Sequence, residues 1–136
     1  MKLHEFAQGK VLGWVPSTDD ATAVVNRWFL EASQTCGCPK VLDHLTWEFS
    51  EEPNFRSDGG ECTTWFNWRG NVSGFEIKIS SFYWRDHPED HRKNLVIHEI
   101  CHAIANYLNN SDQGHNENWK ALMQLCGQPA RLSCMR

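Results

Sequence analysis

The sequence predicts an α+β domain in which a small three-stranded antiparallel sheet packs against three helices. Apolar residues recur every three to four positions in three segments, and they alternate with polar residues in three shorter segments between the first and second of these. With 136 residues, 40% of them hydrophobic, the chain is long enough to bury one core and too short for two. We therefore expect a single domain over residues 1–136, with residues 1–16 as an irregular N-terminal arm.

The first helix is expected from Ser17 to about Cys36. Ser17 is suited to cap it, and Asp20 stands where a capping-box acid stabilises the first turn. Gly37 follows as a residue type that commonly ends a helix. The positions expected to face the core share helical spacing and are Ala21, Val24, Val25, Trp28, Phe29 and Ala32.

Three strands are expected in the middle of the chain. Residues 45–49 and 62–68 alternate in the way that is typical of strands, and Phe75, Ile77 and Ile79 place one face of a third strand in the core. The short connection at Arg69-Gly70 indicates a hairpin between the second and third strands.

The second helix is expected over residues 88–109. It starts with proline and two acidic residues, as the helix dipole favours, and has no internal glycine or proline; Asp86 or His87 is expected to cap it. Its apolar residues cover most of the circumference, which indicates a helix buried inside the domain. A last helix is expected to begin at an Asn116 cap and to end before Gly127.

The polar residues of the buried helix form one stripe, which contains the pattern His98-Glu99-Ile100-Cys101-His102. Residues four apart lie one above the other on a helix, so both histidines can present imidazole nitrogens to one cation. Glu99 lies beside them as a carboxylate suited to general acid/base chemistry. The other members of the stripe are Asn94, Asn106 and Asn109.

Two histidines are too few to hold a catalytic zinc ion, so a third ligand is needed. His115 is the favoured candidate because Gly114 permits a close backbone approach and a short turn lets the chain fold back over the helix. Glu117 is an alternative, although an acid there also suits the first turn of the last helix, and Asp112 is a more distant candidate.

Residues 75–123 resemble the SprT-like zinc metallopeptidases, which have a strand ending in serine, an H-E-x-x-H helix and a later Gly-His followed by an aromatic residue. The chain resembles a minimal form of this family, which lacks the C-terminal cysteine-based zinc module of many relatives. It implies that His98, His102 and His115 bind one catalytic Zn²⁺, that Glu99 is the general acid/base and that Trp119 supports the third ligand.

The resemblance implies a zinc-dependent endopeptidase that hydrolyses protein substrates with a zinc-activated water. The alternative is a non-catalytic, zinc-containing binding module for a nucleic acid or protein partner. An oxyanion donor is also required, and the polar residues near the motif in sequence are Tyr83, Arg85, His87 and Tyr107.

Composition bears on partners and location. The net charge of −4 gives no general attraction for phosphate backbones. Some relatives cleave proteins crosslinked to DNA, which they reach by separate DNA-binding elements, so DNA is expected here only as an activator or scaffold implied by the resemblance. The chain shows neither a secretory signal nor an apolar run of membrane-spanning length, which predicts a cytoplasmic protein with no membrane partner.

Six cysteines are present, and Cys36-Gly37-Cys38 is the one close pair. It lacks a second pair at the spacing of structural zinc sites, because Cys126 and Cys134 are too far apart, and Cys101 is assigned to core packing. We therefore expect one metal ion only.

Overall fold

The computed structural model describes residues 10–11, 18–51 and 59–131. The elements in chain order are β1 (Lys10–Val11), α2 (Thr18–Thr35), the 3-10 helix η1 (Pro39–His44), β2 (Leu45–Ser50), β3 (Gly60–Phe66), β4 (Val72–Ser80), α3 (Ser81–Asp86), α4 (Glu89–Asn109) and α5 (Glu117–Leu125). The α+β class and the three long helical segments expected from the sequence are confirmed.

The sheet is mixed, so the predicted three-stranded antiparallel arrangement is wrong. The strand order is β1-β2-β4-β3, and only the predicted β3–β4 hairpin is antiparallel. β2 runs parallel to β4, with Trp47 opposite Ile77. The reason is that β3 lies at the far edge and reverses the chain, which brings β4 back between β2 and β3 in the direction of β2. Alternation along a strand reports which side is buried and carries no information about direction.

The N-terminal arm is partly a strand. Lys10–Val11 form β1 and pair in parallel with β2 at Glu48 and Phe49. This corrects the expectation of an irregular arm at those two residues, whereas residues 1–9 and 12–16 lie outside the described residues. The predicted helix cap Ser17 lies outside them as well.

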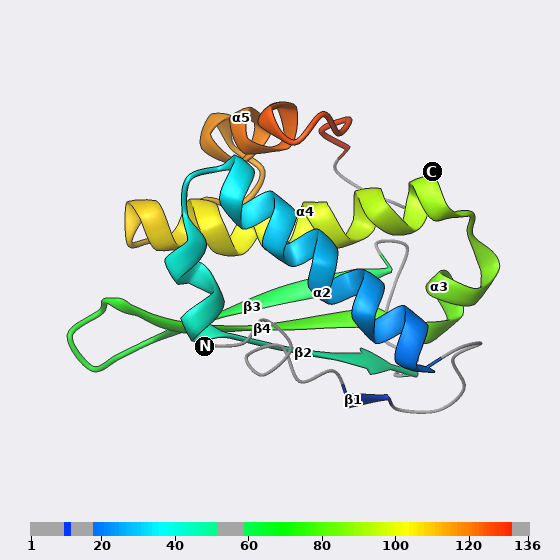
Figure 1. Ribbon diagram of the computed structural model, residues 1–136. Helices are drawn as coiled ribbons and strands as arrows, with labels where there is room; N and C mark the ends of the chain where they lie inside the picture. The colour runs from blue at the N-terminus through cyan, green and yellow to red at the C-terminus, as the bar shows by residue number, and fades with distance from the viewer. Residues whose placement is uncertain (1–9, 12–17, 52–58, 132–136) are drawn as a thin grey trace.

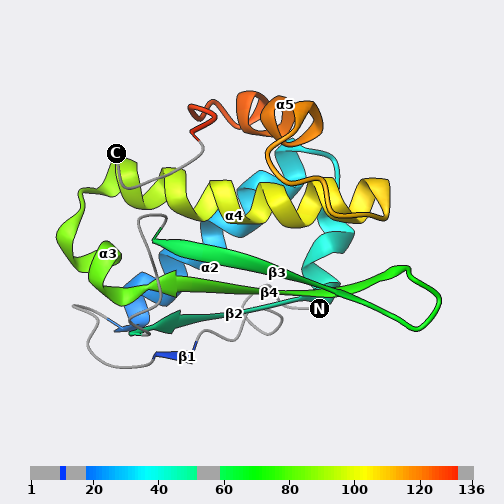
Figure 2. The same ribbon diagram turned by 180° about the vertical axis from the view of Figure 1, so that it is seen from behind.

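One face of the sheet carries α2 and α4, and α5 lies on the other side of α4, away from the sheet (Figures 1 and 2). α4 is therefore enclosed by the sheet, α2 and α5, which confirms the prediction of a buried helix. The core between sheet and helices is formed by aromatic and aliphatic side chains that are almost fully buried. They include Phe29, Trp47, Phe49, Phe75, Ile77, Ile79, Leu95, Ile100 and Ile104.

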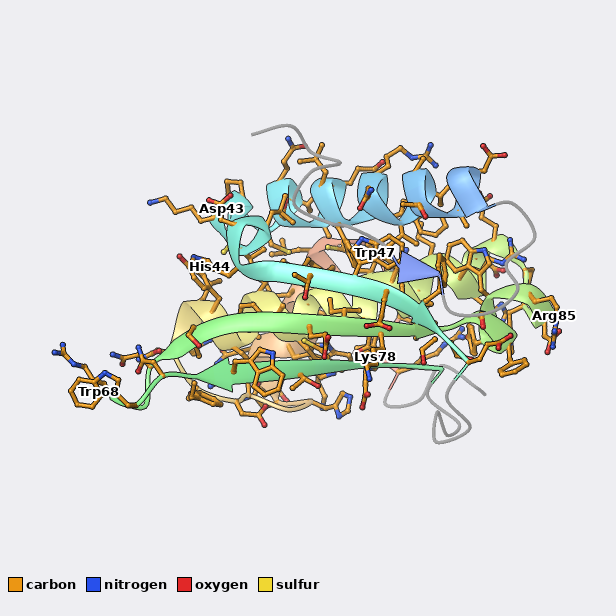
Figure 3. The ribbon with its side chains drawn as sticks, turned by 90° about the horizontal axis from the view of Figure 1, so that it is seen from below. Asp43, His44, Trp47, Trp68, Lys78 and Arg85 are labelled. Carbon is orange, nitrogen blue, oxygen red and sulfur yellow. The ribbon has the colours of Figure 1, made fainter. Side chains whose placement is uncertain are left out.

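The opposite face of the sheet carries polar side chains and, in the described residues, no helix (Figure 3). Lys78 lies on this face, and Trp68 lies at the tip of the β3–β4 connection, 87% exposed. Among the described residues, no helix is long and apolar enough to span a membrane.

The start of α4 differs from the expectation. Asp86 and His87 end a short additional helix, α3, whose cap is Ser80, and Pro88 is the N-cap of α4 without a side-chain hydrogen bond. The Asn116 cap of α5 is confirmed, since its side-chain oxygen accepts hydrogen bonds from the amides of Asn118 and Trp119. These helix ends orient α4 and α5 so that the predicted metal ligands face the same space.

Candidate metal centre

Three histidine side chains converge above the middle of α4. The Nε2 atoms of His98 and His102, one turn apart on the helix, lie 3.1 Å from each other. The Nε2 atom of His115, which comes from the connection between α4 and α5, lies 3.2 Å from each of them. The structure thus brings together the two histidines of the motif and the favoured third candidate.

The triangle of nitrogens is suited to a cation. An imidazole nitrogen offers either one N–H or one lone pair, so among three such atoms at least one pair must face each other as two donors or two acceptors. Hydrogen bonds alone therefore cannot satisfy all three contacts. Tetrahedral zinc with Zn–N bonds of about 2.05 Å places neighbouring ligand nitrogens about 3.3 Å apart, close to the distances in this cluster.

His115 is positioned by a tight turn after α4. Asn110 adopts a left-handed conformation at the end of the helix, with φ of 52°. Inside the last turn, the side chain of Asn106 accepts a hydrogen bond from the amide of Gln113 and donates one to the hydroxyl of Thr64 in β3. Gly114, with φ of 57°, then turns the chain back over the helix. The polar stripe of α4 thus holds the connection that carries the third histidine.

Trp119 packs against all three histidine rings. Its side chain is fully buried, stacks on the His102 ring and meets the rings of His98 and His115 edge-on, with centroid distances of 4.6–5.2 Å. Its indole N–H donates a hydrogen bond to the carbonyl of His98. The indole therefore restricts the rotation of the three rings and fixes α5 against α4.

Two of the histidines make backbone hydrogen bonds that favour one tautomer, in which the nitrogen facing the other histidines carries no proton. His98 bonds to the backbone of Arg131 and His102 to that of Gly114, and both bonds raise the pKa, as an imidazole N–H donating to a carbonyl does. Because Nε2 faces the other histidines, Nδ1 is the nitrogen left for this bond. A metal-binding histidine is commonly held in this way.

Burial keeps these two histidines uncharged. Burial, and then repulsion from His102 and His115, lowers the pKa of His98 to about 3. Burial, and then repulsion from His115, lowers the pKa of His102 to about 4. Both imidazoles are therefore neutral at pH 7, which is the form that binds a metal ion.

Glu99 lines the cleft onto which the histidines open. Its side chain is 2% exposed, and a Cβ atom added at Gly60 would lie 3.4 Å from its Oε2 atom. β3, the first strand of the hairpin, therefore approaches the Glu99 carboxylate closely at Gly60, which has no side chain. The cleft is lined by Gly60, Glu61, Cys62, His98, Glu99, His102, Asn106, Asp112, Gly114 and His115.

The alternative third ligands lie apart from the triangle. The side chain of Glu117 is 91% exposed and lies 3.7 Å from the ammonium of Lys120. Asp112 lines the cleft, and its carboxylate accepts a hydrogen bond from the amide of Gly114. Neither belongs to the group of three ligand atoms formed by the histidines.

The four residues considered as oxyanion donors do not line the cleft. Tyr83 is buried against the His87 ring, Arg85 pairs with Asp86 and Tyr107 stacks on His44. These residues are close to the motif helix in sequence, but in space they lie near its start or on a side away from the cleft. The supporting residues that the sequence did not single out individually are Asn94, Asn106 and Arg131.

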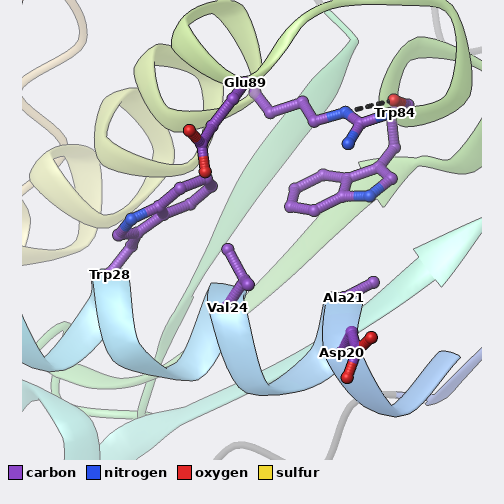
Figure 4. Close-up of a pocket in the computed structure, with 7 residues that line it drawn as sticks. Asp20, Ala21, Val24, Trp28, Trp84 and Glu89 are labelled. Carbon is purple, nitrogen blue, oxygen red and sulfur yellow. Dashed lines mark hydrogen bonds between the residues drawn. The ribbon is translucent and has the colours of Figure 1, made fainter. Parts of the chain in front are cut away.

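A separate cavity lies between α2 and the corner formed by α3 and α4 (Figure 4). Trp28 and Trp84 border it with ring centroids 6.0 Å apart, and the Arg92 guanidinium lies 5.1 Å from the Trp84 ring centre. No histidine or cysteine lines this cavity. The ligand set for a metal ion in a cleft is therefore the histidine cluster.

The fold and the site define a class of protein: a small α+β domain in which a buried helix carries H-E-x-x-H and a following turn adds a third histidine. The chain belongs to the SprT-like family, whose family model matches residues 25–135. This confirms the resemblance expected from the sequence. A search of curated proteins and a search of solved structures each found no match.

Proposed function

We propose that this protein is a zinc-dependent endopeptidase that hydrolyses peptide bonds in protein substrates. The observation that supports it most is the convergence of three histidine nitrogens at distances suited to one tetrahedral zinc ion. Three protein ligands leave one coordination position free, as catalytic zinc sites do. Membership of the SprT-like family is consistent with this assignment.

Zinc bound there would polarise a carbonyl and lower the pKa of a water molecule to about 7. Glu99 is the residue beside the histidines that can accept a proton from the attacking water and pass it to the leaving amine. Its burial keeps bulk water from competing for that proton. Trp119 contacts the rings of His98, His102 and His115 and holds them in place. The three side chains therefore need little reorganisation during the reaction.

The substrate chain would lie along the outer edge of β3, which pairs with no other strand of the described residues. The amide of Ser80 donates to the carbonyl of Gly59, and the alternation of an antiparallel pair then directs the main-chain groups of Gly60, Cys62 and Thr64 away from β4. Gly60 and Cys62 also line the cleft. An extended peptide pairing with this edge would pass the carboxylate of Glu99, which favours unfolded or extended segments as substrates.

The alternative is a binding module with a zinc ion but no hydrolysis. A purely structural zinc usually has four protein ligands and needs no neighbouring base. Here three histidines meet and the buried carboxylate of Glu99 lines the same cleft. These features favour the enzyme.

The test compares the native chain with Glu99→Gln and a matched control, Glu89→Gln, which makes the same charge change at an exposed position of α4. Zinc content and cleavage of casein would be measured, with and without DNA. We expect Glu99→Gln to keep its zinc and to lose about 10²- to 10⁴-fold in cleavage rate, with Glu89→Gln unaffected. Absence of cleavage by the native, zinc-loaded chain under all these conditions would favour the binding module.

A further inference from the structure

Three cysteine thiols meet at a second place on α4. Cys36 follows the end of α2, Cys101 lies in the middle of α4, and Cys126 is the C-cap that follows the end of α5. Their sulfur atoms all lie within 4.8 Å of one another, and those of Cys36 and Cys126 are 3.6 Å apart. Cys101 is fully buried, whereas the other two are partly exposed at the rim.

The arrangement differs from that of ordinary buried thiols, which pack singly as small hydrophobic groups. Each sulfur contacts the other two, although the residues come from three separate elements. A disulfide requires sulfur atoms about 2.05 Å apart and joins only two of them. Neighbouring thiolates on a tetrahedral zinc ion, with Zn–S bonds of about 2.3 Å, lie about 3.8 Å apart, which is close to the separation of Cys36 and Cys126.

The surroundings also suit a cation held by sulfur. Among the described residues, this group of three ligand atoms consists of cysteine sulfurs alone, and neither a histidine nor a carboxylate belongs to it. A zinc ion here would therefore have sulfur ligands and no neighbouring base, unlike one in the histidine cluster.

We propose that Cys36, Cys101 and Cys126 form a second zinc site, with its fourth position left to solvent at the rim. A structural zinc ion usually has four protein ligands, but no carboxylate belongs to this group and the ion would join the end of α2 to the end of α5 across a separation of 90 residues, so we assign it a structural role. It would add a second ion to the one expected from the sequence, and it would give Cys101 a role besides the expected core packing. Cys38, the close sequence neighbour of Cys36, is not part of the cluster.

The experiment titrates Cd²⁺ into the reduced, metal-free full chain and follows the thiolate-to-cadmium charge-transfer absorption, which histidine ligands do not produce. We expect this absorption to saturate at one ion per chain. Cys126→Ser, at the rim, and Cys101→Ser should weaken Cd²⁺ binding at least tenfold. Cys38→Ser, a buried thiol outside the cluster, should leave it unchanged.

Displacement of the bound Cd²⁺ by Zn²⁺ would support zinc as the ion. The proposal is overturned if the native chain shows no thiolate absorption or if Cys126→Ser keeps this absorption in full. It is also overturned if Cu⁺ displaces the bound Cd²⁺ and Zn²⁺ does not. Because Cys126 is partly exposed, its variant keeps the test valid should Cys101→Ser fail to fold. The outcome is independent of peptidase activity.

Discussion

The histidine and cysteine clusters occupy neighbouring sides of one helix, and their construction differs. His98 and His102 are one helical turn apart and open onto a cleft that also contains Glu99. The cysteines come from the ends of α2 and α5 and the middle of α4. The first cluster combines ligands with a base and an accessible strand edge, whereas the second joins three helices. The catalytic and structural roles that we propose for the two clusters therefore depend on the neighbours of each site more than on its ligands.

Removing a histidine should separate the two clusters most clearly, since it should affect one cluster and leave the other intact. In His115→Ala the connection after α4 no longer supplies the third nitrogen, and two protein ligands do not hold catalytic zinc. We expect loss of zinc from the histidine site and cleavage at background level, while the cysteine site still gives its Cd²⁺ absorption. Metal analysis and the casein assay measure the first two. If cadmium absorption is lost as well, the two sites are not separate.

Asn106→Ala should weaken the histidine site without touching a ligand. The variant removes the acceptor for the Gln113 amide and the donor to Thr64, so the turn before His115 loses its support. We expect zinc affinity to fall by about 10- to 100-fold, measured by chelator competition. Asn109→Ala is the control, because within the described part of the chain the Asn109 side chain bonds to the carbonyl of Ala105 in the same helix and not to the turn before His115. Equal losses in both variants would contradict a specific role for Asn106.

Acid should destabilise the metal-free protein through the histidine cluster. The folded pKa of His98 is about 3 and that of His102 about 4, both below the ordinary value of 6.5. The unfolded chain therefore binds more protons below about pH 6.5, and stability present above that pH is lost as the pH falls towards these values. Urea unfolding at about pH 7.5 and about pH 4.5 should differ by a few kcal/mol. His102→Gln should show a smaller difference, and an equal one would contradict this origin.

Cys126→Ser should have the smallest effect on activity. The residue lies at the far end of α5 from His115, so we expect kcat/KM to change by no more than about twofold. The thermal midpoint of the zinc-loaded protein should fall by several degrees, since the ion that joins α2 to α5 is lost. Calorimetry measures the midpoint. A large loss of activity with an unchanged midpoint would reverse the roles assigned to the two clusters.

The sequence predicted the features that depend on local spacing. The HExxH helix, its burial and the Asn116 cap follow from periodicity and capping residues, and these agree with the structure. The direction of β2 relative to β4 was not predictable, because it depends on β3 lying at the far edge. The cysteine cluster was not predictable either, since Cys36, Cys101 and Cys126 are brought together only by helix packing.

The supporting part of the histidine site was predicted only as a pattern. Asn94 and Asn106 belong to the polar stripe, but the sequence did not indicate what they bind. Asn94 donates to the carbonyl of Pro129 and thereby holds the segment that leads to Arg131, while Asn106 holds the turn before His115. Both partners lie far enough along the chain that only the folded structure identifies them.

The open edge of β3 also bears on how the protein avoids association with itself. Among the described residues β3 pairs with β4 alone, and edge amides and carbonyls that could accept a peptide, as we propose, could equally accept a strand from another copy. Two features limit this: the charged side chain of Glu61 is exposed on the strand, and the pairing with β4 becomes irregular between Trp65 and Phe66. The regular pairing runs from Gly60 to Trp65, so a long strand from another copy would find little regular edge beyond these residues.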